Sequence, residues 1–551
     1  MELNLPPEIL TKIFEQLNST DKSNVALTCS LFNEIISHPV NWNMLSLKKK
    51  SEISPATPLT YGRFAWVTAI ILPYQGNYSI LDQHDNLLSK QHLSELLSAM
   101  AGRPTITTLD LEGQSRLRYV AAQEIATSVK HLKNINLANT TLGTCHLSLL
   151  LNSFSNKSNL DRLEITNIRI SEVCPMLVGQ AFRKVKHLTL RNLHITTDQM
   201  TNILNQEPYN HIKHLDLSRN AINNTAFTML LSIIRSLISL NLSETEVETE
   251  YWVPKILTSA KTSTTLRTLN LNDSKQCIGL TTDPRYHATD HHLPGIINLT
   301  SLDLSYTLIS NSLLTKIIKH ISESKTTMMH LYLNKVNLSR INDELLSTAV
   351  SKLKTCELGF TSLTKSQCCA TFSALKNSTT TRRRLSLNSV QNIQYVDPKI
   401  FANVLTYTEF IDVSNAAITL KQWDYLFEII TTKGPIKLQI GNFALNTTLS
   451  ESRYIVGALP KLKAFDISSC NMYKDISGTF VSLIKHCIEL NITRRIFYSN
   501  TYHWKEFKKL LEKIMINYNN TNILISPRAM NTDASWRNLS PCYSRLTDVP
   551  I

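Results

Sequence analysis

Residues 285–292 (RYHATDHH) are the best candidate for a metal site in this chain of 551 residues. His287 and His291 are four residues apart with Asp290 between them, and imidazole and carboxylate groups bind zinc. Histidines at this spacing ligate one ion when they share a helix face, but prolines lie on both sides and favour a loop. We therefore expect a solvated loop, or a contact loop for a partner, and predict no metal and no other cofactor.

Other residues that could take part in catalysis or ligand binding are scattered along the sequence. The chain contains no GxGxxG, P-loop, GxSxG or HExxH motif, and its 13 glycines are too few to favour phosphate-binding loops. Ten cysteines occur without CxxC spacing, so we expect a reducing compartment, no disulfide framework and Cys356 as a core thiol. These patterns predict a non-catalytic protein.

The net charge of +14 permits nucleic acid or another acidic partner without identifying one. Residues 64–72 are the nearest candidate for a membrane span, but they are too short to cross a bilayer, so no membrane association is expected. The N-terminus carries two acidic residues and two prolines within its first eight positions, which is unlike a signal peptide.

An LxL pattern followed by small polar residues recurs along most of the chain, as in His214–Asn220 (HLDLSRN) and Ser301–Thr307 (SLDLSYT). The copies follow one another about every 27 residues, and residues 67–72 form an earlier, irregular copy. The first apolar residues of the regular copies are Leu109, Ile135, Leu163, Leu188, Leu215, Leu240, Leu269, Leu302, Leu331, Cys356, Leu385, Ile411, Leu438 and Phe465.

This period is typical of leucine-rich repeats, in which each copy supplies a short strand and a returning helix. Apolar residues at helical spacing predict helices at 226–236, 312–321 and 422–430. No repeat can bury its apolar face alone, so neighbouring repeats must stack. We predict an α/β fold, a leucine-rich-repeat solenoid shaped as a horseshoe with parallel strands inside and helices outside.

The residue between the two apolar positions of each copy should face the concave side. Half of these fourteen residues are acidic and none is Lys or Arg, which favours a basic or hydroxyl-rich polypeptide and makes nucleic acid unlikely. Alternatively, the Asp residues are structural and hydrogen-bond neighbouring strands. Tyr332 and Phe410 are the first expected anchors, since aromatic residues often anchor interfaces. The predicted substrate-binding residues are Asp216, Asp303, Tyr332, Glu357, Arg384, Phe410 and Asp412.

Two further features accompany the expected concave face. His187, His214 and His330 line part of it. The run Arg382–Arg384 could bind an acidic group or form a solvated edge.

Residues 1–47 do not follow the repeat. A proline pair precedes an apolar helix, and two further short apolar segments end near Trp42. A three-helix bundle of this size has too little core to be stable unless it docks on another protein.

This N-terminal segment resembles an F-box. The resemblance rests on Leu5, Pro6, Glu8, Ile9, Leu10, Ile13, Phe14, Leu17, Asp21, Leu27, Cys29 and Trp42, in that order. The segment departs from the family at Thr28, where an apolar residue is usual, and at Phe32, where Trp is usual.

An F-box ahead of leucine-rich repeats resembles the substrate receptors of SCF-type ubiquitin ligases. The resemblance implies that the F-box binds a Skp-family adaptor, and through it cullin and RING subunits, while the repeats bind a protein substrate for ubiquitination and proteasomal degradation. It also implies a eukaryotic protein of the cytoplasm, the nucleus or both. The implied adaptor-binding residues are Leu5, Pro6, Ile9, Leu10, Ile13, Phe14, Leu17, Leu27, Cys29 and Trp42.

Two alternatives remain open: an interaction scaffold acting outside ubiquitin transfer, and a basic repeat protein associated with nucleic acid. The expected organisation is an F-box at 1–47, a linker and N-terminal cap with the irregular first repeat at 48–105, the solenoid at 106–490, a C-terminal cap at 491–529 and a flexible tail at 530–551.

Overall fold

The computed structural model divides into two compact units, Met1–Leu299 and Thr300–Ile551, which are considered separately. The structure describes residues 44–46, 69–71, 90–101, 105–155, 160–183, 185–205, 211–222, 224–246, 249–261, 265–274, 294–323, 328–378, 383–413, 416–433, 439–441, 464–466, 494–498 and 523–527. The segment 285–292 and the ten predicted adaptor-binding residues lie outside the described residues.

The first unit alternates short strands with helices. Its strands are β1 (Met44–Ser46), β2 (Ala69–Ile71), β3 (Thr108–Asp110), β4 (Asn134–Asn136), β5 (Arg162–Thr166), β6 (His187–Arg191), β7 (His214–Asp216), β8 (Ser239–Asn241) and β9 (Thr268–Asn270). Its helices are α5 (Lys90–Ala101), η4 (Ser115–Tyr119), α6 (Ala122–Ser128), α7 (Thr144–Ser155), α8 (Pro175–Phe182), α9 (Thr197–Leu204), α10 (Asn224–Ile234), α11 (Thr249–Lys261) and η6 (Pro294–Asn298).

The second unit repeats this order. Its strands are β10 (Ser301–Asp303), β11 (His330–Tyr332), β12 (Thr355–Glu357), β13 (Arg383–Ser386), β14 (Thr408–Asp412), β15 (Gln439–Gly441), β16 (Ala464–Asp466), β17 (Arg494–Tyr498) and β18 (Ile523–Pro527). Its helices are α12 (Asn311–Glu323), α13 (Asp343–Lys352), α14 (Lys365–Lys376), η7 (Gln391–Tyr395), α15 (Pro398–Thr406) and α16 (Leu420–Lys433).

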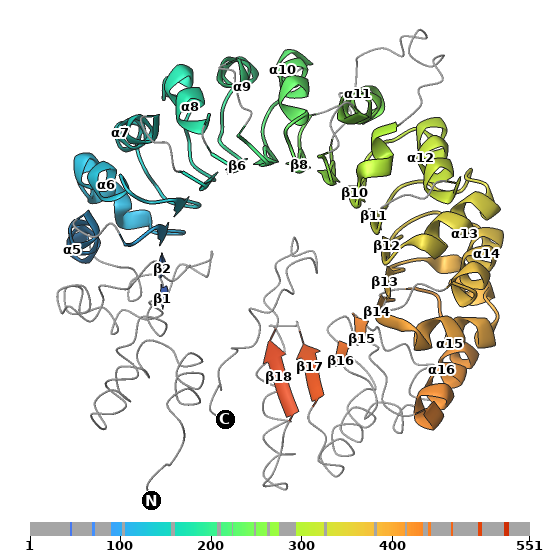
Figure 1. Ribbon diagram of the computed structural model, residues 1–551. Coiled ribbons are helices and arrows are strands. Elements are labelled where there is room, and N and C mark those ends of the chain that lie inside the picture. The colour runs from blue at the N-terminus through green and yellow to red at the C-terminus, as the bar shows by residue number, and fades with distance from the viewer. Residues whose placement is uncertain are drawn as a thin grey trace, which may run out of the picture. The chain divides into compact units, whose positions relative to one another are not determined.

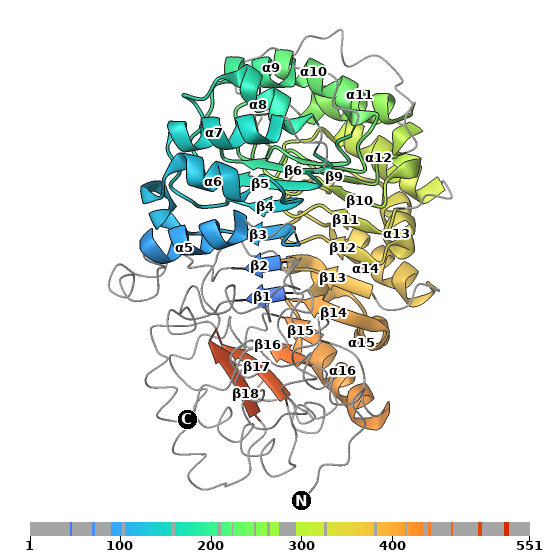
Figure 2. The same cartoon turned by 60° about the vertical axis from the view of Figure 1, so that its left-hand side comes forward.

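Within each unit, successive strands pair in parallel and in chain order. The helices cover the outer face of the strand layer and leave the inner face open (Figure 1; Figure 2). The predicted α/β leucine-rich-repeat solenoid is therefore confirmed.

The core lies between the strands and the helices. Both apolar residues of an LxL pair, such as Leu302 and Leu304, are 0% exposed, and so are helix residues such as Ile317. Full burial of one such side chain contributes roughly 1.5–3 kcal/mol, so the repeated apolar positions account for the stacking. Cys356 occupies one of these positions at 3% exposure, which confirms the predicted core thiol.

One predicted register is wrong. Ile440, not Leu438, aligns with Ile411 on β14 and with Phe465 on β16. Leu438 and Ile440 are two residues apart, and a strand keeps the same side chains on each face when its register shifts by two. Apolar alternation alone therefore could not distinguish them.

The strand layer also extends further along the chain than the range expected for the solenoid. The irregular copy at 67–72 forms β2, which aligns Ile70 with Leu109. β1 lies within the segment expected to be the F-box, and β17 and β18 lie within the expected C-terminal cap.

Each strand from β3 to β13 ends in a turn with a positive-φ residue, which is the third residue after most of these strands. We call these residues the turn column: Gly113, Asn139, Arg219, Glu244, Asp273, Tyr306, Lys335, Phe360 and Ser389, together with Asn167 and Asn192 after the longer strands β5 and β6. A buried Ser or Thr hydroxyl follows five of these residues, as at Thr361, which donates to the Leu358 carbonyl at 2.6 Å. Where it occurs, this hydroxyl therefore satisfies a buried carbonyl.

Buried glutamines join neighbouring repeats. Gln367 is 0% exposed, forms a capping box with Thr364 at the start of α14, and donates to the carbonyls of Leu338 and Ile341 at 2.8 and 2.7 Å. Gln422 in α16 donates in the same way to the preceding repeat at Ile393 and Val396, both at 2.9 Å. Each glutamine therefore satisfies two buried carbonyls that water does not reach.

We predict that Gln367→Leu lowers the local free energy of unfolding by about 2–4 kcal/mol, because it leaves two carbonyls without their donor and the Thr364 N–H at the start of α14 without its acceptor. Amide hydrogen exchange across α13 and α14 measures this opening. Gln123→Leu, at an exposed position on α6, is the matched control and should leave exchange unchanged. Equal protection in both variants would contradict the structural role of Gln367.

Candidate protein-binding surface

The inner face of each unit is built from two columns of side chains. The middle residue of each LxL pair forms the inner column, and the residue before each pair forms the edge column. In the second unit the register places Asp303, Tyr332, Glu357, Ser386 and Asp412 side by side in the inner column.

Four of the seven predicted substrate-binding residues, Asp303, Tyr332, Glu357 and Asp412, therefore lie in one column. Arg384 and Phe410 lie side by side in the edge column of the same unit, and Asp216 is in the first unit. Phe410 and Tyr332 are half-buried, whereas Arg384 is exposed.

Three aspartates of the inner column, Asp110, Asp216 and Asp303, accept backbone N–H groups of their own turns. One carboxylate oxygen of Asp216 accepts the Ser218 N–H at 2.9 Å, and Asp303 accepts the Ser305 N–H at 3.0 Å. Asn241 holds the same position and accepts from Ser243 at 3.0 Å. The shared geometry shows that Asp at this position stabilises the turn, whatever its charge.

Burial reduces the acidic character of this face further. Asp303 is 2% exposed and Asp412 is 7% exposed. The second carboxylate oxygen of Asp216 accepts from the Asn241 side chain at 2.9 Å, across the strand pair. The structural alternative considered for these residues is therefore the better account, and a preference for basic partners does not follow from counting acids.

The arginine run at 382–384 is split between two environments. Arg383 is 7% exposed and donates to the Ser351 carbonyl at 2.5 Å and to the Ser378 hydroxyl. Arg384 points to the exposed side of the same strand. Only Arg384, of these two, is available to an acidic group on a partner.

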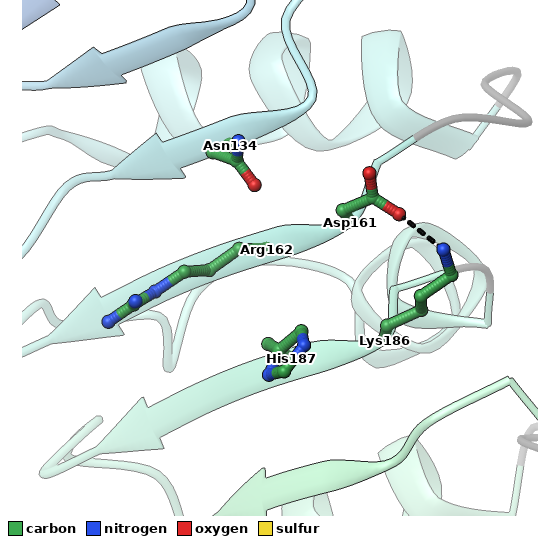
Figure 3. Close-up of a pocket in the computed structure, with 5 residues that line it drawn as sticks. All are labelled: Asn134, Asp161, Arg162, Lys186 and His187. Carbon is green, nitrogen blue, oxygen red and sulfur yellow. Dashed lines mark ion pairs between the residues drawn. The ribbon is translucent and has the colours of Figure 1, made fainter. Parts of the chain in front are cut away.

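The edge column of the first unit carries a hollow of about 330 Å³ lined by Asn134, Asp161, Arg162, Lys186 and His187. Figure 3 shows Asn134, Arg162 and His187 on successive strands, with Lys186 paired to Asp161 at 2.8 Å. Arg162 pairs with Glu164 at 3.1 Å. Both pairs are exposed and contribute at most about 1 kcal/mol each, so a charged partner could displace them.

His187 and His214 stack beside this hollow. Their ring centroids are 4.3 Å apart and the rings are nearly parallel at 6°. Burial and the neighbouring His187 lower the pKa of His214, because both disfavour the imidazolium form. The stack therefore opposes protonation of His214 on this edge.

Other groups in this region of the chain do not form a metal centre. No cluster of three or more His, Cys, Asp or Glu residues suited to a metal ion occurs among the residues that the structure describes.

No described helix is both long and apolar enough to cross a bilayer.

Sequence reasoning missed the turn column as part of the surface. Its side chains border the inner face, and in the second unit they include the exposed aromatics Tyr306 and Phe360. In most repeats this residue follows a small polar residue, so its place in the repeat could be read from the sequence. An aromatic residue, unlike Gly or Asn, gives no sign that its φ is positive.

The chain was compared with protein families, curated proteins and solved structures. Residues 3–48 match the F-box-like family. No curated protein matches the chain. Among solved structures, the leucine-rich repeat-containing protein LegL7 from Legionella pneumophila is similar at 18% identity with a TM-score of 0.33, over 62% of this chain and 90% of that one. The repeat assignment rests on the strand register of this chain and not on that similarity.

The chain thus combines an F-box-like segment with a leucine-rich-repeat solenoid, and it is an F-box/leucine-rich-repeat protein. F-box domains generally bind Skp-type adaptors. The inner face of the repeats is the surface on which a second protein could bind.

We predict that acidification destabilises the first unit through His214. Its folded-state pKa lies below the usual value, so the unfolded chain takes up a proton first as the pH falls through about 6.5, and the unfolding free energy falls with it. His214→Gln should reduce this loss while leaving stability at pH 8 nearly unchanged. Urea unfolding of both proteins at pH 8 and pH 5.5 measures the difference, and a steeper loss in the variant would contradict the prediction.

Cysteine reactivity gives a second expectation. Burial raises the pKa of the Cys356 and Cys368 thiols to about 12, so neither forms the reactive thiolate near neutral pH. Cys145 and Cys174 are exposed. Brief alkylation of the native protein should modify Cys145 and Cys174 and spare the buried pair, as measured by peptide mass spectrometry. Early modification of Cys356 would show that the core is open.

Proposed function

We propose that this protein is the substrate-recognition subunit of an SCF-type ubiquitin ligase. The observation that carries the proposal is the order of its parts: an F-box-like segment at residues 3–48 precedes a long repeat solenoid with an open inner face. The F-box-like segment binds a Skp-family adaptor, and through it cullin and RING subunits. The repeats bind a protein substrate.

In this role the chain performs no chemistry of its own. It holds a substrate lysine near a ubiquitin thioester, and tethering raises the effective concentration of the reacting groups. Tighter binding of a protein at the repeats therefore makes ubiquitin transfer to that protein faster and more selective. The product is a substrate marked for proteasomal degradation. The protein acts in the cytoplasm, the nucleus or both, where the thiols that it carries stay reduced.

The adaptor contact is tested by changing the predicted apolar face of the F-box-like segment. Leu5→Asp, Ile9→Asp and Phe14→Asp together place charge where an apolar surface must be buried, so we expect the affinity for a recombinant Skp-family adaptor to fall by about 100-fold or more. Isothermal titration calorimetry with the full chain measures this loss.

The control introduces the same charge elsewhere. Met176→Asp, at a position that is 54% exposed on α8, should leave adaptor affinity unchanged. If the intact chain does not bind the adaptor, or if the triple variant binds it equally well, the ligase proposal is wrong. Adaptor binding without any change in the half-life of bound proteins would instead indicate a scaffold.

A further inference from the structure

The turn column differs in kind between the two units. A positive φ is tolerated by Gly, Asn and Asp but is unfavourable for bulky side chains. Apart from Gly113, the described turn column of the first unit carries only polar or charged residues. In the second unit Tyr306 has φ 61° and Phe360 has φ 56°.

Polar side chains of the turn column in the first unit bind one another. Asn167 donates to the Asn139 side chain at 2.5 Å, and Asn192 donates to Asn167 at 2.8 Å. Further along, Arg219 pairs with Glu244 at 2.6 Å. These side chains stabilise one another, so the fold explains their presence.

Packing does not explain the aromatic pair in the same way. Tyr306 is 43% exposed and Phe360 is 50% exposed, so each leaves much of its apolar ring in water at a strained backbone position. Asn at either position would relieve the backbone at little cost in burial. Rings this exposed at positive-φ positions point to a contact outside the chain.

The two aromatics belong to one surface. Backbone hydrogen bonds from Tyr306 to Asn334 and from Lys335 to Gly359, both 2.8 Å, place the turns of Tyr306, Lys335 and Phe360 side by side. The Lys335 ammonium lies 5.8 Å from the centre of the Tyr306 ring.

Two more aromatics, Tyr332 and Phe410, lie in the inner and edge columns of the same unit. The inner and edge columns of the first unit, from β3 to β9, contain no Phe, Tyr or Trp. The aromatic side chains of the candidate surface are thus concentrated in the second unit.

The exposed charges that accompany these aromatics are positive. Lys335 and Arg384 are exposed, and among the described residues neither forms an ion pair with an acid. The nearby acids are otherwise engaged, since Asp303 and Asp412 are buried and Glu357 accepts from the Asn334 side chain at 2.7 Å. Asn334 is itself held by the Gly359 N–H at 2.8 Å.

We propose that Tyr306, Tyr332, Lys335, Phe360 and Arg384 form an aromatic–basic patch that binds a partner polypeptide segment in which apolar side chains alternate with Asp or Glu. The apolar side chains pack on the exposed rings, and the carboxylates pair with Lys335, in the turn after β11, and with Arg384, near the start of β13. Tyr and Arg are the residues most enriched at energetic centres of interfaces. The proposal deepens the substrate-binding role proposed above and rests on it.

The test uses the full chain and a random dodecapeptide phage library as the probe. Peptides selected on the intact protein should combine apolar residues with Asp or Glu, and their synthetic forms should bind the double variant Tyr306→Asn, Phe360→Asn about tenfold or more weakly. Tyr119→Asn, which removes a ring that is 53% exposed in the first unit, is the matched control and should bind as the intact chain does.

Misfolding is excluded by the choice of Asn, which is favoured at positive φ, so the melting temperature of the double variant should be equal or higher. Lys335→Glu should weaken binding of the acidic peptides and favour Lys- or Arg-containing ones. Selection of basic peptides by the intact chain, or equal binding to the intact chain and the double variant, would overturn the proposal.

Adaptor affinity measured on the same double variant separates this proposal from the proposed function. A chain that distinguishes the peptides as expected but does not bind a Skp-family adaptor refutes the ligase role and supports the patch. A chain that binds the adaptor but fails the peptide test refutes the patch alone.

Discussion

Backbone pairing between successive short strands is the interaction on which the structure depends. Most strands are three residues long, and each is held by the strands before and after it, as when Lys213 and His214 both donate to the Lys186 carbonyl at 2.8 and 3.0 Å. Such strands are too short to persist alone, so each repeat is stable only within the stack. The buried glutamines and the turn hydroxyls then satisfy the carbonyls that stacking removes from water.

Regular pairing also arranges the surface. Because equivalent residues of successive repeats align, three positions per repeat become three continuous columns, and the chemistry of each column is set by residue choice alone. In the first unit these columns are polar, with stacked histidines and self-supporting asparagines. In the second unit they carry aromatics and unneutralised cations, so the two units present different surfaces on the same backbone.

The LxL spacing predicted the strands, their order and most of their alignment, because apolar burial at a fixed period leaves few alternatives. It failed at Leu438, since a shift of two residues keeps the same face buried. Residue type also could not show that Asp303 and Asp412 are buried, or that the Asp303 carboxylate accepts a backbone N–H of its own turn. The importance of Phe360 could not be predicted, because its strained φ is a property of the turn and not of phenylalanine.

In the proposed role, the F-box-like segment joins a ligase and the repeats hold a target protein. The most direct measurement is the half-life of a protein bound by the repeats, compared in cells that express the intact chain or a chain with a charged F-box face. If the account is correct, the variant still binds that protein but the half-life of the protein lengthens. An unchanged half-life, with binding to both chains intact, would contradict it.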